Sequence, residues 1–153
     1  MILKSKKGFI GQMLTLFLLI FWAGFAYGNS VKILAPKNGE RVGARVIVKG
    51  TSKITDGSHI WVLAHLKLLK DQWWPQPKPV VDDKDDWQAL VYLGGPQDVG
   101  MEFEIAVATF NKDEEAKILR YHEYGQKTGQ FIPMPFPKTT SPIDIVTVKK
   151  VSH

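Results

Sequence analysis

The chain has 153 residues, of which 44% are hydrophobic and 23% are charged, a composition typical of one globular domain that argues against disorder. Its formal charge is +5, but three lysines precede residue 28, and the remainder carries 17 basic against 15 acidic side chains. That balance, without a clustered Lys/Arg stripe, argues against nucleic acid or anionic lipid as a partner, and the lack of cysteine excludes disulfides.

Residues 1–28 have the pattern of a secretory signal peptide, which predicts an N-terminal signal helix. Lysines precede an apolar stretch, and Ala26-Tyr27-Gly28 places small residues where signal peptidase reads them, so cleavage is expected before Asn29. An uncleaved anchor is the alternative, because residues 10–27 approach the length that spans a bilayer. Both alternatives place residues 29–153 outside the cytoplasm, as a secreted, periplasmic or cell-surface domain.

The rest of the chain alternates short apolar segments with turn formers. Strands are expected at residues 31–34, 42–49, 59–66, 87–93, 101–110 and 143–151. Gly50 is expected to end the second of these strands. Prolines at positions 75, 77 and 79 cannot donate to a sheet ladder, so this segment is expected to be an edge strand or a rigid loop.

The strand at 59–66 separates two kinds of side chain. Alternation places Ile60, Val62, Ala64 and Leu66 on one face, which is expected to be core. The opposite face carries His59, Trp61, Leu63 and His65. Because that face is mixed, it is expected to be covered by another element or to be partly wet.

A helix is expected from Asn111 to Tyr124. Asn111 is a good N-cap, and acidic residues follow in the first turn, where the helix dipole favours them. The side chains expected to form its apolar side are Ala116, Ile118, Leu119 and His122. Gly125 is expected to stop the helix, and a proline-rich loop to follow as far as residue 142.

This order of elements predicts an all-β fold. About seven strands with one short helix before the last, and no alternation of strands with helices, are typical of a single antiparallel β-sandwich at residues 29–153. The opening phrase VKILAPKNGERVGARVIVKGTS, the Trp-Trp-Pro-Gln motif and Gly100-x-x-Phe103 resemble bacterial extracytoplasmic immunoglobulin-like domains of largely uncharacterised role. The resemblance implies an immunoglobulin-like fold and an extracytoplasmic location, and it supplies no catalytic residues.

The doubled tryptophan is the strongest candidate for a binding surface. Trp73 and Trp74 can offer flat faces to a partner's peptide or to a sugar ring, or they can pack as core. Neighbours on an extended chain point to opposite sides, so at least one is expected to face away from whatever the other packs on. The candidate partner-binding residues are Trp73, Trp74, Gln76, Trp61, His59 and His65.

The expected function is therefore a non-catalytic binding or assembly module for an envelope or surface protein. The alternative is a carbohydrate-binding module that uses Trp73 and Trp74 as a stacking platform. The membrane is expected to be contacted only through the leader, if that stays uncleaved.

No cofactor, metal or catalytic residue is predicted. His59 and His65 are about 20 Å apart along a strand, too far to share one metal ion. The acidic run Asp82–Asp86 lacks the glycine and distant glutamate of an EF-hand, so a solvated hairpin turn is expected, with weak calcium binding left open. Without cysteine or a serine on a glycine-rich elbow, an enzyme is not expected; a metal-dependent hydrolase is the remaining alternative.

Overall fold

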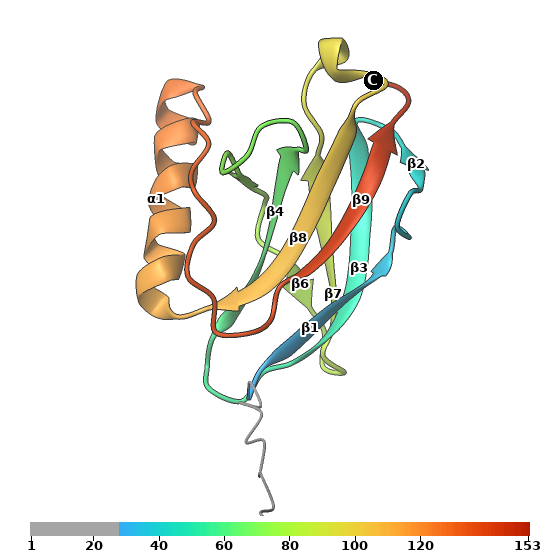
Figure 1. Cartoon of the computed structure of the whole chain (residues 1–153). Helices are drawn as coiled ribbons and strands as arrows, with labels where there is room; N and C mark the ends of the chain where they lie inside the picture. Colours follow the sequence, from blue (N-terminus) through green and yellow to red (C-terminus); the bar gives the residue numbers. More distant parts are fainter. Residues whose placement is uncertain (1–27) are drawn as a thin grey trace, which may run out of the picture.

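The computed structural model describes residues 28–153, and the signal peptide or anchor predicted at the start of the chain lies outside the described residues except for Gly28 (Figure 1). The described part is mostly β-structure with one α-helix, which confirms the coarse prediction of the fold class. Its strands form two sheets.

The first sheet is entirely antiparallel. Its four strands are, in spatial order, β1 (Ser30–Ala35), β3 (Arg45–Lys53), β7 (Asp86–Tyr92) and β6 (Val80–Val81). Strands β1 and β7 lie at nearly the bounds predicted from the sequence, 31–34 and 87–93. The short strand β6 was not predicted, because two residues are too few to show alternation.

The second sheet is mixed. Its five strands are, in order, β2 (Arg41–Val42), β9 (Asp144–Lys150), β8 (Glu102–Phe110), β4 (His59–Leu66) and β5 (Trp74–Pro75). All neighbours pair antiparallel except β2 with β9, which are parallel. The described residues therefore form nine strands rather than about seven, and three of them are only two residues long.

Apolar side chains of the two sheets meet in one core between them. Ile60, Val62 and Ala64 of β4 lie in this core, as the alternation along the strand predicted. They pack in one cluster with residues from both sheets, including Val48, Trp87, Val91, Ile105 and Val148.

A second core covers the opposite face of the five-stranded sheet. Helix α1 (Lys112–Thr128) lies on the side of β4 and β8 that faces away from β3 and β7 (Figure 1). Trp61 and Leu63 of β4 pack there against Ile118 of the helix, together with Trp73, Ala106, Ala108, Phe110 and Phe136. The mixed face of β4 is therefore covered.

Asn111 begins the helix as predicted. Its side-chain oxygen accepts a hydrogen bond from the backbone N–H of Glu114 at 3.0 Å. The predicted stop at Gly125 is wrong, because the helix continues to Thr128 and ends at Gly129, which adopts the left-handed conformation (φ 75°). Among the described residues, no helix is long and apolar enough to cross a membrane.

Gly125 serves packing rather than termination. The ring of Phe131, which follows the helix, occupies the space where a Cβ atom would stand. We expect Gly125→Ala to destabilise the protein by about 1 kcal/mol in urea unfolding, although alanine is the better helix former, because the ring must move. In a Phe131→Ala background the same change should be neutral or stabilising, and equal destabilisation in both backgrounds would contradict this account.

Gly50 also lies inside an element and makes room for a neighbouring group, so its predicted role as the end of a strand is wrong. The sequence predicts that it ends a strand, but β3 continues through it to Lys53. The indole of Trp87 and the backbone carbonyl of Lys32 fill the space beside its Cα atom. A glycine inside a strand here marks a close approach of neighbouring groups.

Candidate partner-binding groove

A groove of about 980 Å³ runs along the Trp-Trp-Pro-Gln segment. One wall comes from α1 and another from the residues that link β7 to the short 3-10 helix η1 (Pro96–Asp98). Most of its lining is aromatic or aliphatic, with contributions from Leu119, Tyr121, His122 and Phe131. Of the six residues predicted from the sequence, four line the groove and two do not: Trp61, His65, Trp74 and Gln76 do, whereas Trp73 and His59 do not.

Trp73 is a core residue in this structure. Its side chain is 8% exposed and lies in the second core. One ring face stacks on His65 with ring centroids 3.8 Å apart, and Phe136 meets the ring edge-on at 4.9 Å. Its backbone exchanges two hydrogen bonds of 2.9 Å with Met134. These contacts fasten the segment that follows α1 to the sheet.

Trp74 is partly exposed and lines the groove. It pairs with Ala64 at the edge of the sheet. Its indole N–H donates to the carbonyl oxygen of Phe131 at 2.9 Å, which fixes the orientation of the ring. Trp73 and Trp74 thus lie in different surroundings, one in the core and one beside the groove.

Gln76 connects three elements from a buried position. Its amide nitrogen donates to the carbonyl of Trp74 (2.9 Å), and its amide oxygen accepts from the backbone N–H of Tyr92 on β7 (2.8 Å). Its own carbonyl oxygen lies 3.1 Å from Nε2 of His122 on α1. The motif's glutamine therefore positions the edge strand against the other sheet and the helix.

A buried carboxylate on α1 organises the end of β4. Glu115 is 7% exposed, and its Oε2 lies 2.5 Å from Nδ1 of His59. Its Oε1 accepts a hydrogen bond from the indole N–H of Trp61 (3.2 Å) and lies 3.6 Å from the ammonium of Lys78. The same ammonium stands 5.9 Å from the ring centroid of Trp61. His59 and Trp61 therefore hold the helix to the sheet.

Sequence reasoning missed Glu115, which was interpreted only as a first-turn acid that favours the helix dipole. The spacing of residues along the helix could have indicated that Glu115 faces the sheet. Glu115, Ile118 and His122 recur at helical intervals and share one face, whereas Leu119, assigned to the apolar side, is half exposed.

Three titratable groups in or beside the groove, Glu115, His122 and Tyr121, have shifted pKa values. Burial raises the pKa of Glu115, but hydrogen bonds from His59 and Trp61 outweigh it and hold that pKa below its ordinary value. Burial lowers the pKa of His122, and the hydrogen bond to Gln76 opposes this only in part. Burial also raises the pKa of Tyr121 to about 12. His122 and Tyr121 are therefore neutral at neutral pH.

The two candidate histidines have separate environments. His65 is buried against Trp73, its Nδ1 lies 3.1 Å from the carbonyl oxygen of Leu69, and its Nε2 lies 3.4 Å from Glu104 without hydrogen-bond alignment. His59 instead contacts Glu115. Within residues 28–153, no three His, Asp or Glu side chains are close enough together to hold a metal ion.

The acidic run forms the turn between β6 and β7, as predicted. A carboxylate oxygen of Asp82 accepts hydrogen bonds from the backbone N–H groups of Lys84 and Asp86. Such a turn needs no cation to close, and weak calcium binding there stays an open alternative.

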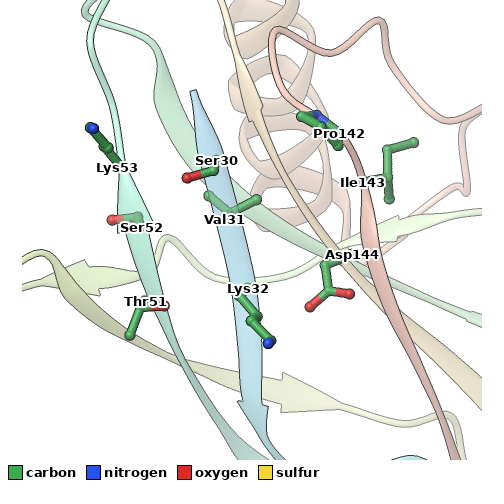
Figure 2. Close-up of a pocket in the computed structure, with 9 residues that line it drawn as sticks. All are labelled: Ser30, Val31, Lys32, Thr51, Ser52, Lys53, Pro142, Ile143 and Asp144. Carbon is green, nitrogen blue, oxygen red and sulfur yellow. The ribbon is translucent and has the colours of Figure 1, made fainter. Parts of the chain in front are cut away.

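A second hollow of about 560 Å³ lies at the start of β1. Residues of β1 and β3 line it together with Pro142, Ile143 and Asp144 (Figure 2). One carboxylate oxygen of Asp144 accepts a hydrogen bond from the backbone N–H of Ile33 at 2.7 Å, which ties β1 to β9.

Comparison with protein-family models and with curated proteins found no match to this chain.

Proposed function

We propose that residues 29–153 form an immunoglobulin-like β-sandwich. That fold has strands A, B, E and D in one sheet and C, F and G in the other, with a C′ strand added beside C in variable-type domains. If β1, β3, β7 and β6 are taken as A, B, E and D, and β9, β8, β4 and β5 as G, F, C and C′, both strand orders are reproduced. Three features differ. Strand β2 lies parallel beside the G strand and has no counterpart in these orders, α1 stands between the F and G strands, and Trp61 on the C strand faces that helix rather than the core between the sheets.

We propose further that this domain is a non-catalytic binding or assembly module outside the cytoplasm, and that it holds a segment of an envelope or surface protein in the groove beside Trp74. The groove carries the proposal, because it combines a large, mostly apolar lining with one partly exposed indole held in a fixed orientation. Aromatic anchors of this kind supply much of the energy of protein interfaces. The extracytoplasmic location rests on the leader.

The experiment compares Trp74→Ala with a control variant, Ile145→Ala, which removes an exposed apolar side chain on β9 that does not line the groove. Each protein is immobilised and exposed to an envelope extract of the source organism, and captured proteins are quantified by mass spectrometry. We expect Trp74→Ala to reduce capture of the partner about thirtyfold, corresponding to about 2 kcal/mol. Ile145→Ala should capture as the wild type does, and equal capture by all three proteins would contradict the proposal.

A carbohydrate-binding module is the competing function. Trp73 is buried and stacks on His65, so only one of the two indoles is left for the expected sugar-binding platform. The carbohydrate-binding function is therefore less well supported than protein binding. A glycan array separates the two functions: retention on polysaccharide that depends on Trp74, with no captured protein, would favour the carbohydrate module.

A further inference from the structure

The two sheets differ in what covers their outer faces. The five-stranded sheet is covered by α1 and Phe136, whereas the outward side chains of the four-stranded sheet are exposed or partly exposed within the described part of the chain. Three of them are large and apolar or aromatic: Val80 is 67%, Ile47 is 50% and Tyr92 is 49% exposed. We call this second surface the open face; its outward residues are Lys32, Arg45, Ile47, Lys49, Thr51, Lys53, Val80, Asp86, Gln88, Leu90 and Tyr92.

Charge is divided across the open face from one side to the other. Lys32 on β1 and Arg45, Lys49 and Lys53 on β3 form a basic half. The β7 and β6 half has no basic side chain; Asp86 stands on it, and the acidic turn Asp82–Asp86 closes it. None of the four basic side chains makes an ion pair with another described residue. In the sequence they appear as isolated charges, because those on β3 are four residues apart and Lys32 lies on a different strand.

The cross-strand register sets each residue of the basic half beside a residue of the other half. Arg45 pairs with Tyr92, Ile47 with Leu90, Lys49 with Gln88 and Thr51 with Asp86. Lys32 extends the last of these rows on the far side of Thr51. Three of these four rows pair groups that complement one another: cation with aromatic ring, aliphatic with aliphatic, and hydroxyl group with acid, where Lys32 adds a cation. The fourth row pairs Lys49 with the neutral amide of Gln88.

We propose that the open face is the interface through which two copies of this chain associate. A two-fold axis parallel to the strands places β3 of one copy over β7 of the other and keeps every row in line. Arg45 then faces the ring of Tyr92 in the partner copy, Ile47 faces Leu90, and the basic half faces the acidic turn. Such an arrangement is isologous and closed, and two sheets packed with their strands nearly aligned are a common solution for exposed apolar faces.

This interface is separate from the groove, although Tyr92 borders both. The test uses charge reversal on each half. Lys32→Glu with Lys53→Glu cancels the net positive charge of the basic half, because Arg45 and Lys49 remain, and Asp83→Lys with Asp86→Lys makes the acidic half basic. The control is Lys112→Glu with Arg120→Glu, which gives the same change of charge on exposed residues of α1. The wild type and all variants are expressed with their own leader, and the molar mass of each protein in solution is measured by light scattering.

We expect the wild type and the α1 control to be dimers, and each open-face variant to associate at least about tenfold more weakly, with the effect reduced by salt. An equal mixture of the two open-face variants should form a heterodimer. A wild type that stays monomeric at every concentration, or a dimer that both reversals leave unchanged, overturns the proposal.

Cross-linking gives the geometry independently, because the chain contains no native cysteine. Lys49→Cys in one copy should cross-link to Gln88→Cys in another through a bismaleimide with a reach of about 10 Å, the spacing of packed sheets. Two copies carrying Arg120→Cys should not cross-link, and if they do so in preference to the first pair, α1 and not the open face is the interface.

Discussion

Trp73→Ala is expected to lower the free energy of unfolding by about 3–5 kcal/mol, the range for removing a large aromatic side chain from a core. The ring fills the space between His65 and Phe136, and its removal leaves a cavity in the second core. The segment after α1 also loses its side-chain contact with this ring through Phe136, while the backbone pairing with Met134 can persist. Urea unfolding followed by circular dichroism measures the change.

Trp74→Ala is the matched comparison, because it removes the same side chain from the neighbouring position. We expect it to cost about 1 kcal/mol, mainly through the lost hydrogen bond to Phe131. If the two variants lose equal stability, Trp74 is as much a core residue as Trp73, and the division of roles between them is wrong.

Glu115→Leu should have the second largest effect, about 2–3 kcal/mol. Trp61 is 1% exposed, and the change leaves its indole N–H without a hydrogen-bond acceptor. It also removes the carboxylate that His59 and Lys78 contact. Glu115→Gln keeps an acceptor for the indole and should cost less. A Glu115→Leu protein as stable as the wild type would show that α1 is held by apolar contacts alone.

The same carboxylate predicts a dependence of stability on pH. Because the folded pKa of Glu115 lies below its unfolded value, its contribution is full above about pH 4.3 and is lost as the pH falls through the folded pKa. The pKa of His122 is also lower in the folded protein, so a separate loss begins below about pH 6.5, where unfolded histidine takes up a proton. Glu115→Gln should reduce the more acidic loss, to which Asp56, Glu114 and Glu123 also contribute because their pKa values are lowered too, and leave the one due to His122.

The alternation of side chains along the strands carried most of the fold prediction. Ile60, Val62 and Ala64 lie in the core between the sheets because a strand must place every second residue on one face. The same rule predicted that the mixed face with Trp61 was either covered by another element or partly wet. It did not say that α1 was the cover, because contacts between distant segments leave no periodic signal in the chain.

The two glycines show where local rules failed. Gly50 and Gly125 were interpreted as ends of elements, since glycine is common there. Both instead lie inside elements, where an aromatic ring from elsewhere in the chain takes the place of a side chain. Only the tertiary structure brings Trp87 and Phe131 to these positions.

The sequence drew attention to the Trp-Trp-Pro-Gln motif through its concentration of large aromatic side chains, but only the structure shows which of these side chains are buried. The Trp-Trp-Pro-Gln motif does border the groove, and its paired indoles do differ in exposure. Which indole packs inward follows from the position of Met134 and Phe136, which are far along the chain. Gln76 was named as a candidate contact residue, but its amide is occupied within the protein.

Hydroxyl-radical footprinting of the native protein, read out residue by residue by mass spectrometry, tests most directly that this motif offers one accessible indole beside a groove. We predict that Trp74 is oxidised readily, while Trp61, Trp73 and Trp87 are protected until the protein unfolds. Oxidation of Trp73 as fast as Trp74, or protection of all four, would contradict the account.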